Sequence, residues 1–318
     1  MKKPSFFFYF SIAFLLFLVV WCSSINAQHE TPQPSAIEGR WDLSITSNGK
    51  VIPSWLEVNH SGIRTLVGHF VGSGGSARPI SQVFVEGAMF HFAIPPQWEN
   101  TDKDLKVNGR VEADKLSGTM TMPDGNTYPF TGVRAPSLRT VKQPVWGPPI
   151  TLFNGKDLTG WTALGTNQWM VESGVLKSAK SGANIRTDKT FKDFKLHVEF
   201  RYPKGSNSGV YLRGRYEVQI EDSKGSEPWL GGLGALYGFL KPSDMVAKDP
   251  GEWQSYDITL IGRRVTVIAN GKMIIQNQEI PGLTGGALDS NEGEPGPIYF
   301  QGDHGAIEFR NIVITPAK

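Results

Sequence analysis

The sequence predicts an all-β protein, and three observations support this fold class. The 318 residues include 36 Gly and 21 Pro, and 11% of the residues are aromatic. Long stretches of helix-forming residues at helical spacing are nearly absent, whereas short alternating runs recur about every 8–12 residues with turn signals between them. This pattern is typical of strands joined by tight turns. Because domains usually contain about 100–200 residues, the length predicts two domains.

Residues 1–27 predict a secretory signal peptide. Two lysines precede an apolar run over residues 6–21, and the small residue Ala27 lies at the end of the segment. The run is shorter than the roughly 20 residues that span a bilayer, which disfavours a membrane anchor. A lipid anchor on Cys22 is disfavoured by the bulky residue before it. We therefore expect an exported protein that is periplasmic, in the cell envelope or secreted, with no stable membrane insertion after cleavage.

Cleavage after residue 27 would remove two lysines and the only cysteine, so the formal charge would fall from +2 to 0. The processed chain would then have no disulfide, no catalytic thiol and no cysteine-based metal site. A balanced charge gives no electrostatic footprint for nucleic acid or for an anionic membrane surface. No glycine-rich phosphate loop precedes a helical pattern, so a nucleotide cofactor is not expected.

A small up-and-down β-barrel is expected over residues 37–134. Eight alternating runs follow one another, and Asn-Gly, Ser-Gly, Glu-Gly and Asp-Gly pairs separate several of them. A meander of this kind closes into a barrel. Its interior either binds a small ligand or is filled by side chains. The expected strands are 40–46, 54–59, 65–71, 81–85, 89–94, 105–111, 115–122 and 128–133.

A proline-rich linker over residues 135–149 is expected to precede a second domain, residues 150–316. Each proline fixes its backbone and removes a hydrogen-bond donor. Among eleven further strand candidates, Asn270-Gly271 between two alternating runs indicates a two-residue hairpin. So many strands exceed a small barrel, and two packed antiparallel sheets accommodate them better. The candidates are 169–171, 175–178, 184–187, 194–202, 209–213, 216–221, 254–261, 264–269, 272–276, 297–301 and 307–314.

The segment from Asn207 to Asp222 is the most informative, and it predicts two successive strands. In the second strand, apolar residues alternate with Glu217, Gln219 and Glu221, which places two carboxyl groups and an amide on one face. Such a row is either ordinary solvent-facing surface or the floor of a site.

The predicted strand at residues 194–202, which precedes this segment, carries a second polar row. If this strand neighbours the next two, Glu199, Arg201 and Arg213 share one polar face with the row that includes Glu217. His304 lies in a turn that enters the last predicted strand. A single histidine in a loop is more often a surface residue than a catalytic one.

Six motifs of the second domain occur in the order seen in a known family. They are LFNGKDLTGW (152–161), NSGVYLR (207–213), YEVQ (216–219), GEW (251–253), NG (270–271) and FRNI (309–312). Each motif is weak alone, but six in order over one domain length are specific. The segment over about residues 150–316, half of the chain, resembles the 3-keto-disaccharide hydrolase family.

This resemblance implies a concanavalin A-like jelly roll whose concave face holds carbohydrate. It also implies an enzyme that cleaves 3-keto-glycosides by elimination and rehydration, a net hydrolysis, after a separate oxidoreductase has made the ketone. Glu217 or His304 would then supply the base and the acid. Asn207, Arg213 and Gln219 would donate to the enolate and to sugar hydroxyls. Glu199 and Trp253 complete the expected substrate-binding set.

Two other classes of function stay open from the residues. Glu217-x-Gln219-x-Glu221 mimics the Glu-x-Asp-x-Glu strand of jelly-roll glucanases, which are retaining glycoside hydrolases, although Gln219 replaces the middle acid. A non-catalytic carbohydrate-binding module would instead stack sugar rings on aromatic residues. A divalent metal also stays open, without regular ligand spacing. The aromatic candidates are Trp229, Tyr237 and Trp253, and the metal donors are Glu217, Asp222, Asp303 and His304.

Overall fold

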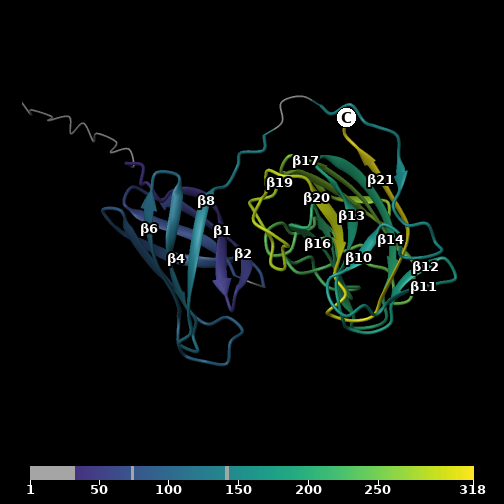
Figure 1. Cartoon of the computed structure of the whole chain (residues 1–318), viewed down its shortest axis with the longest axis horizontal. Helices are drawn as coiled ribbons and strands as arrows, with labels where there is room; N and C mark the ends of the chain where they lie inside the picture. The colour runs from purple at the N-terminus through teal and green to yellow at the C-terminus, as the bar shows by residue number, and fades with distance from the viewer. Residues whose placement is uncertain (1–32, 73–74, 140–142) are drawn as a thin grey trace, which may run out of the picture. The chain divides into compact units, whose positions relative to one another are not determined.

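The structure is a computed structural model that describes residues 33–72, 75–139 and 143–318. Every secondary-structure element assigned to these residues is a β-strand, drawn as an arrow in Figure 1. The predicted all-β class is therefore confirmed. In the described part of the chain, no helix is long and apolar enough to cross a membrane. The predicted signal peptide lies outside the described residues.

The first eight strands form a closed antiparallel barrel in sequence order, because β8 pairs with β1. All eight predicted strands are present. Gly49, Gly62, Gly87 and Gly125 have φ angles of 74°, 71°, 60° and 90°, as the predicted turns require. The strands are β1 (Gly39–Ser47), β2 (Lys50–Ser61), β3 (Thr65–Val71), β4 (Arg78–Glu86), β5 (Met89–Ile94), β6 (Leu105–Glu112), β7 (Lys115–Thr121) and β8 (Thr127–Arg134).

The barrel interior is filled by side chains. Alternate residues of each strand point inward, and the resulting cluster includes the buried rings of Trp41, Phe70, Phe90 and Phe92. Gly109 makes room for one of these rings, because a Cβ at this position would lie 2.3 Å from the ring of Phe90. Of the two interiors that the sequence left open, the structure has the filled one.

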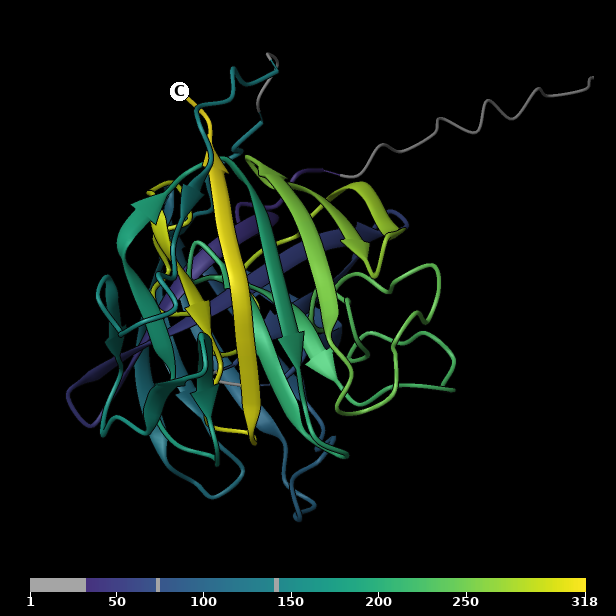
Figure 2. The same cartoon turned by 90° about the vertical axis from the view of Figure 1, so that its right-hand side faces the viewer.

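The later strands form two antiparallel sheets of a jelly-roll β-sandwich, and all eleven predicted strands occur. The smaller sheet has the order β10-β13-β20-β15-β16, and the larger has the order β11-β12-β21-β14-β17-β18-β19, with β9 paired to β21. Figure 2 shows β21 as the long yellow arrow. The strands are β9 (Ile150–Thr151), β10 (Trp161–Ala163), β11 (Trp169–Glu172), β12 (Val175–Ser178), β13 (Ile185–Phe191), β14 (Phe194–Arg201), β15 (Asn207–Leu212), β16 (Tyr216–Glu221), β17 (Gln254–Ile261), β18 (Arg264–Ala269), β19 (Lys272–Glu279), β20 (Gly296–Phe300) and β21 (Ile307–Pro316).

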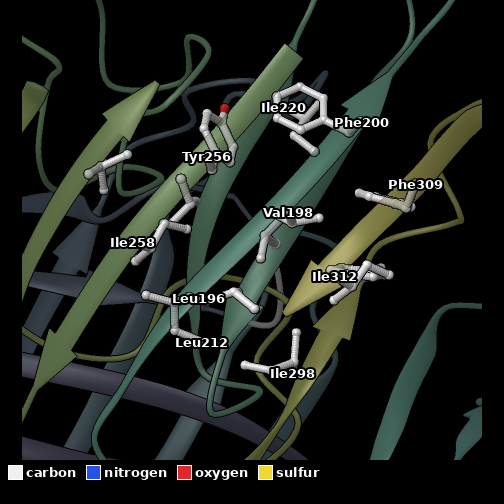
Figure 3. Close-up of a cluster of buried hydrophobic side chains, with 14 of the residues drawn as sticks. Leu196, Val198, Phe200, Leu212, Ile220, Tyr256, Ile258, Ile298, Phe309 and Ile312 are labelled. Carbon is white, nitrogen blue, oxygen red and sulfur yellow. The ribbon is translucent and has the colours of Figure 1, made fainter. Parts of the chain in front are cut away.

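The apolar faces of the two sheets meet in one core, as Figure 3 shows. Val198 on β14 and Phe309 on β21 come from the larger sheet, and Ile220 on β16 comes from the smaller one. Because neighbouring residues of a strand point to opposite faces, Glu217, Gln219 and Glu221 must lie on the outer face of the smaller sheet. The predicted alternation in this strand is confirmed.

The expected neighbourhood of the strand at 194–201 is wrong. β14 pairs with β17 and β21 in the larger sheet, whereas β15 and β16 belong to the smaller sheet. The chain passes from the larger sheet to the smaller one between β14 and β15, so adjacency in the sequence does not give adjacency in space here. Glu199 and Arg201 therefore do not share a polar face with Glu217.

Several contacts connect the barrel with the sandwich. The side chain of Trp55 lies edge-on to Phe239, with ring centroids 5.2 Å apart, and it packs with Val71 and Leu283 in a small apolar cluster. A guanidinium nitrogen of Arg40 lies 2.6 Å from the carboxylate of Glu279. These contacts bring part of the barrel close to the loops that cover the smaller sheet.

Candidate functional site

A polar cavity of about 290 Å³ lies on the outer face of the smaller sheet. Strands β15, β16 and β20 supply its floor, since their inward residues fill the core and their alternate residues face the cavity. Tyr211 lies directly opposite Glu217 on β16 and opposite Tyr299 on β20. The lining residues are Gly75, Asn184, Asn207, Tyr211, Glu217, Gln219, Tyr237, Gly285, Gly286, Tyr299, Gln301, Asp303 and His304.

Loops cover the polar row of β16 and bury it. One edge of β16 is hydrogen-bonded to the segment 234–237, in which the amide of Tyr237 donates to the carbonyl of Glu217 at 3.0 Å. From a second loop, the hydroxyl of Thr284 accepts a bond from the amide of Glu217 at 3.0 Å. Only 3% of Glu217 remains exposed. Glu217 and Gln219 of this row therefore belong to the floor of a cavity rather than to solvent-facing surface.

Burial raises the pKa of Glu217 to about 8, and the negative charge of Asp303 acts in the same direction. The hydroxyl of Tyr211 lies 2.9 Å from the carboxyl of Glu217 and 2.9 Å from the carbonyl oxygen of Gly285. A phenol has one hydrogen to donate. The bond from Tyr211 to Glu217 favours the ionised form of the carboxyl group. Burial has the larger effect, and the pKa of Glu217 therefore stays raised.

The absence of a side chain at Gly209 gives this carboxyl group its space. Gly209 lies opposite Gln219, on the same face of the sheet as Glu217. A Cβ at position 209 would lie 2.2 Å from Oε1 of Glu217. That distance is far below van der Waals contact, so a larger residue would force the carboxyl group to move.

His304 and Asp303 lie at the mouth of the cavity. Nδ1 of His304 is 2.6 Å from a carboxylate oxygen of Asp303, and both side chains are about half exposed. The carboxylate holds the ring by Nδ1, which leaves Nε2 free of that contact and available to accept a proton. The turn predicted around His304 thus carries a histidine–aspartate pair beside a buried carboxyl group.

Two amide side chains of the cavity lining contain buried oxygens without a partner. Oε1 of Gln219 and Oε1 of Gln301 make no hydrogen bond within the described protein. An unpaired buried polar group costs about 1–3 kcal/mol, so a ligand with hydroxyl groups would relieve a real penalty. Asn184 adds a donor, with Nδ2 2.5 Å from the hydroxyl of Tyr299.

The charge of the cavity favours an uncharged ligand. The lining residues in the described part of the chain include Glu217 and Asp303 but no lysine or arginine. An anionic ligand would meet negative charge without a compensating cation. Hydroxyl, amide and phenol groups instead suit a sugar. Nor does the described chain contain a group of three or more His, Cys, Asp or Glu side chains that could hold a metal ion.

The structure places four of the predicted site residues in this cavity: Glu217, His304, Asn207 and Gln219. Asn207 lies opposite Glu221 on β16 and donates to its carboxylate. Tyr237, expected as a sugar-stacking residue of a binding module, also lines the cavity.

The other three predicted residues lie elsewhere. Arg213 is fully buried, and its guanidinium donates to the carbonyl of Gly262 at 2.6 Å. Glu199 accepts bonds from Arg310 and Asn311 on the larger sheet. Arg310 also lies over the ring of Trp253, with its guanidinium carbon 3.9 Å from the ring centroid. Arginine packing accounts for these positions without a ligand.

Sequence reasoning missed four polar residues of the cavity: Asn184, Tyr211, Tyr299 and Gln301. Tyr211 could have been found, because it alternates with Val210 and Leu212 and so must share the outer face with Asn207. Tyr299 could not, since the pairing of β20 with β15 joins segments about 90 residues apart in the sequence.

Comparisons with known proteins point to one family. The profile of the 3-keto-alpha-glucoside-1,2-lyase-like domain matches residues 148–315, which include every residue of the cavity except Gly75. A 3-keto-disaccharide hydrolase of Bacteroides thetaiotaomicron is 32% identical over 91 residues. That match covers 24% of this chain and 31% of the relative.

Solved structures of candidate glycosyl hydrolases from Parabacteroides distasonis are also similar. One is 28% identical, with a TM-score of 0.45, over 57% of this chain and 96% of the other. A second is 21% identical, with a TM-score of 0.43, over 54% of this chain and 94% of the other.

Proposed function

The chain belongs to the 3-keto-alpha-glucoside-1,2-lyase-like domain family, and from that premise we propose that it cleaves 3-keto-glycosides by elimination and rehydration. The observation that carries this proposal is the pairing of a buried, neutral carboxyl group, Glu217, with the exposed His304–Asp303 pair around one polar cavity. An elimination needs one group that accepts a proton and another that donates one.

The ketone determines the order of bond changes. A carbonyl at carbon 3 makes the hydrogen on carbon 2 acidic, because the electron pair left on carbon 2 delocalises onto the carbonyl oxygen as an enolate. The enolate then returns its electrons to form a double bond between carbons 1 and 2, and the bond from carbon 1 to the leaving oxygen breaks. Water adds across this double bond, with its hydroxyl on carbon 1 and a proton on carbon 2. The net change is hydrolysis.

We assign the base to His304 and the acid to Glu217. Nε2 of His304 accepts the proton from carbon 2, while Asp303 stabilises the imidazolium through Nδ1. Glu217, whose pKa of about 8 keeps it protonated near neutrality, gives its proton to the leaving oxygen. The ionised Glu217 then takes a proton from the attacking water, and His304, whose half-exposed ring exchanges its proton with solvent, gives a proton to carbon 2. Every proton is thus restored after one turnover.

Amide groups support the enolate in this scheme. Asn184, Asn207 and Gln219 line the cavity without a cation beside them, so developing negative charge is stabilised by hydrogen-bond donors rather than by an ion pair. The unpaired oxygens of Gln219 and Gln301 accept from sugar hydroxyls. Burial of these polar groups raises the strength of each contact.

The test compares a 3-keto-glucoside with its unoxidised parent. We expect release of the leaving group from the ketone only, and turnover in deuterated water should place deuterium on carbon 2. His304→Ala and Glu217→Gln should each lower turnover by roughly 10²–10⁴-fold. A matched control is His197→Ala, since His197 is a partly exposed histidine paired with Asp257 on the outer face of the larger sheet.

Other outcomes would identify another function. A retaining glycosidase would cleave the unoxidised parent and exchange no hydrogen bound to carbon. A carbohydrate-binding module would cleave neither compound but would be retained on a sugar column. Absence of deuterium at carbon 2 in a product that does form would rule out the elimination.

We further propose that the protein is exported and receives its substrate from a separate oxidoreductase that makes the 3-keto sugar. Residues 1–27 have the pattern of a signal peptide, and the chain has no nucleotide-binding motif with which to oxidise the sugar itself. N-terminal sequencing of the protein from cell-envelope fractions should begin near Gln28. An intact Met1 in cytosolic protein would contradict export.

A further inference from the structure

Residues that follow barrel strand β3 lie at the polar cavity. Gly75, which follows β3, lines the polar cavity together with the residues of the sandwich. Its neighbour Ser76 lies directly against Gly238, where a Cβ would be 2.7 Å from the Cα of Ser76. Gly238 follows the cavity residue Tyr237. This part of the barrel is thus packed against the loop that covers the polar row of β16.

A second cavity of about 330 Å³ adjoins the first, because Gly75 lines both. Its other lining residues come from the barrel, and they are mainly apolar, with Phe70, Met120 and Met122 beside Trp98. The first cavity is polar and the second presents an aromatic ring. A sugar ring has hydroxyl groups at its edge and an apolar face of C–H groups, so the two cavities complement different parts of a carbohydrate.

Trp98 is exposed and yet fixed in place. The side chain is 56% exposed, although most of the surface of a tryptophan side chain is usually buried in a folded protein. Arg78 lies over the ring, with its guanidinium carbon 4.9 Å from the ring centroid. A Cβ at Gly75 would approach the ring to 2.8 Å, so only a glycine permits this close packing.

Arg78 anchors the loop that carries this tryptophan. The arginine is 4% exposed, and it donates to the carboxylate of Glu99 at 2.8 Å and to the carbonyl of Pro95 at 2.9 Å. The other oxygen of Glu99 accepts from the amides of Gln97 and Trp98. A buried arginine therefore organises the loop on both sides of an exposed ring, which preorganises the ring for stacking.

We propose that Trp98 is a stacking platform for the leaving-group sugar of a 3-keto-disaccharide. The inference rests on the proposed function, since it assigns the second sugar ring of the same substrate. A cavity of about 290 Å³ is at the lower end of the size of small-molecule sites. It holds the oxidised ring, and the leaving sugar extends past Gly75 onto the indole face. The barrel thereby selects disaccharides over glycosides with small leaving groups.

The experiment compares two 3-keto-glucosides that differ in the leaving group, one with glucose and the other with methanol. Trp98→Ala should lower kcat/KM for the disaccharide roughly 3–10-fold, as expected for one lost aromatic contact, and leave kcat/KM for the methyl glycoside unchanged. Trp98→Phe should retain most of the preference. Phe84→Ala is the matched control, because Phe84 is a barrel aromatic that is 46% exposed, stacks on His91 and lines neither cavity.

Equal effects of Trp98→Ala on both substrates, or no effect on either, would overturn the platform while leaving the proposed function intact. A loss of preference in Phe84→Ala as large as that in Trp98→Ala would also overturn it, because the effect would then belong to the barrel as a whole. Wild-type protein that releases neither glucose nor methanol from the two ketones would overturn the proposed function and this inference together.

Discussion

Glu217 is a buried titratable group, and the burial of its ionised form lowers the stability of the folded protein at high pH. Its pKa is raised to about 8 in the folded protein, mainly by burial, whereas an unfolded glutamate titrates near 4.3. Between these two values the folded state binds more protons than the unfolded state. The free energy of unfolding must therefore fall as the pH rises through this range.

Glu217→Gln removes this titration while keeping the shape of the side chain. We expect the variant to gain stability relative to the wild type from pH 5 to pH 9, as measured by chemical denaturation at each pH. Other groups contribute equally to both proteins, so the difference isolates Glu217. A difference that does not change with pH would show that the carboxyl group is ionised in the folded protein.

The same group predicts one limb of the pH–rate profile. If Glu217 donates the proton to the leaving oxygen, kcat/KM should decline as the pH rises through about 8, because kcat/KM reports the ionisation of the free enzyme. The profile of the wild type on a 3-keto-glucoside measures this directly. Activity that instead increases through pH 8 would make Glu217 the base and require the two roles to be exchanged.

Gly209→Ala tests how tightly the carboxyl group must be positioned. The added methyl group would lie 2.2 Å from Oε1 of Glu217, so the carboxyl group must leave its present position. We expect turnover of a 3-keto-glucoside to fall at least about 10²-fold, as small displacements of reacting groups do, while the far-UV circular dichroism spectrum is retained. Gly293→Ala is the control, since a Cβ there meets nothing closer than 3.8 Å. A fully active Gly209→Ala variant would remove Glu217 from the reaction.

At the scale of elements, the β15–β16 hairpin connects the cavity with the core. Its turn contains Arg213, which has a φ angle of 53°, and its guanidinium donates to the carbonyl of Gly262 in the β17–β18 turn. A second bond reaches the hydroxyl of Tyr216 at 3.3 Å. The arginine therefore fixes the hairpin to the opposite sheet, with no contact to the cavity.

We expect Arg213→Ala to destabilise the protein without a specific effect on substrate binding. The change leaves the carbonyl of Gly262 buried without this partner, at a cost of about 1–3 kcal/mol for one unsatisfied group. Urea denaturation should show this loss, and KM at a temperature well below the transition should stay within a few-fold of the wild type. A large rise in KM with unchanged stability would return Arg213 to the substrate-binding set.

Alternation along single strands made much of this fold predictable from the sequence. The barrel strands and the inward and outward faces of β16 follow from periodicity, which is a local property. Two short strands, β9 and β10, were missed because two or three residues carry no period. The sheet partners of β14 were also missed, because hydrogen bonds between distant segments decide them.

The same distinction between local patterns and long-range pairing applies to the residues of the site. Glu217 and Gln219 could be predicted from one strand and the family resemblance, and Asn207 from the strand before it. Tyr299 and Gln301 enter from β20, whose place beside β15 no local pattern specifies. Burial of Glu217 depends on two covering loops, so its raised pKa could not be predicted either. Arg213 and Trp253 were expected from motif positions and Glu199 from the polar row of its strand, but packing explains the surroundings of all three.

At the scale of the whole molecule, the barrel and the sandwich have separate cores. The buried residues of the barrel cluster lie between Ile37 and Phe130, and those of the sandwich cluster lie between Phe153 and Ile314. A small third cluster around Trp55 and Leu283 joins them, together with the ion pair between Arg40 and Glu279. This pattern predicts two units that fold independently and stabilise each other modestly.

A fragment of residues 143–318 should therefore fold by itself. It contains the whole sandwich core and keeps the bridge between Trp146 and Ala317 near its two ends. We expect a cooperative thermal transition, at a lower temperature than the sandwich transition in the full chain, because the cluster with Trp55 is lost. Limited proteolysis of the full chain near residues 138–141 should yield nearly the same fragment.

The fragment also separates catalysis from substrate selection. It retains Glu217, His304 and the amide groups of the cavity but lacks Gly75 and Trp98. We expect it to cleave the methyl 3-keto-glucoside at a rate within several-fold of the full chain and to lose the preference for the disaccharide. The full chain with Trp98→Ala should show the same selectivity as the fragment, since both lack the indole ring. Two results would instead make the barrel an obligatory part of one folding unit. In one, neither half is recovered as a folded protein after cleavage. In the other, the full chain melts in a single transition and cleavage does not separate the two halves.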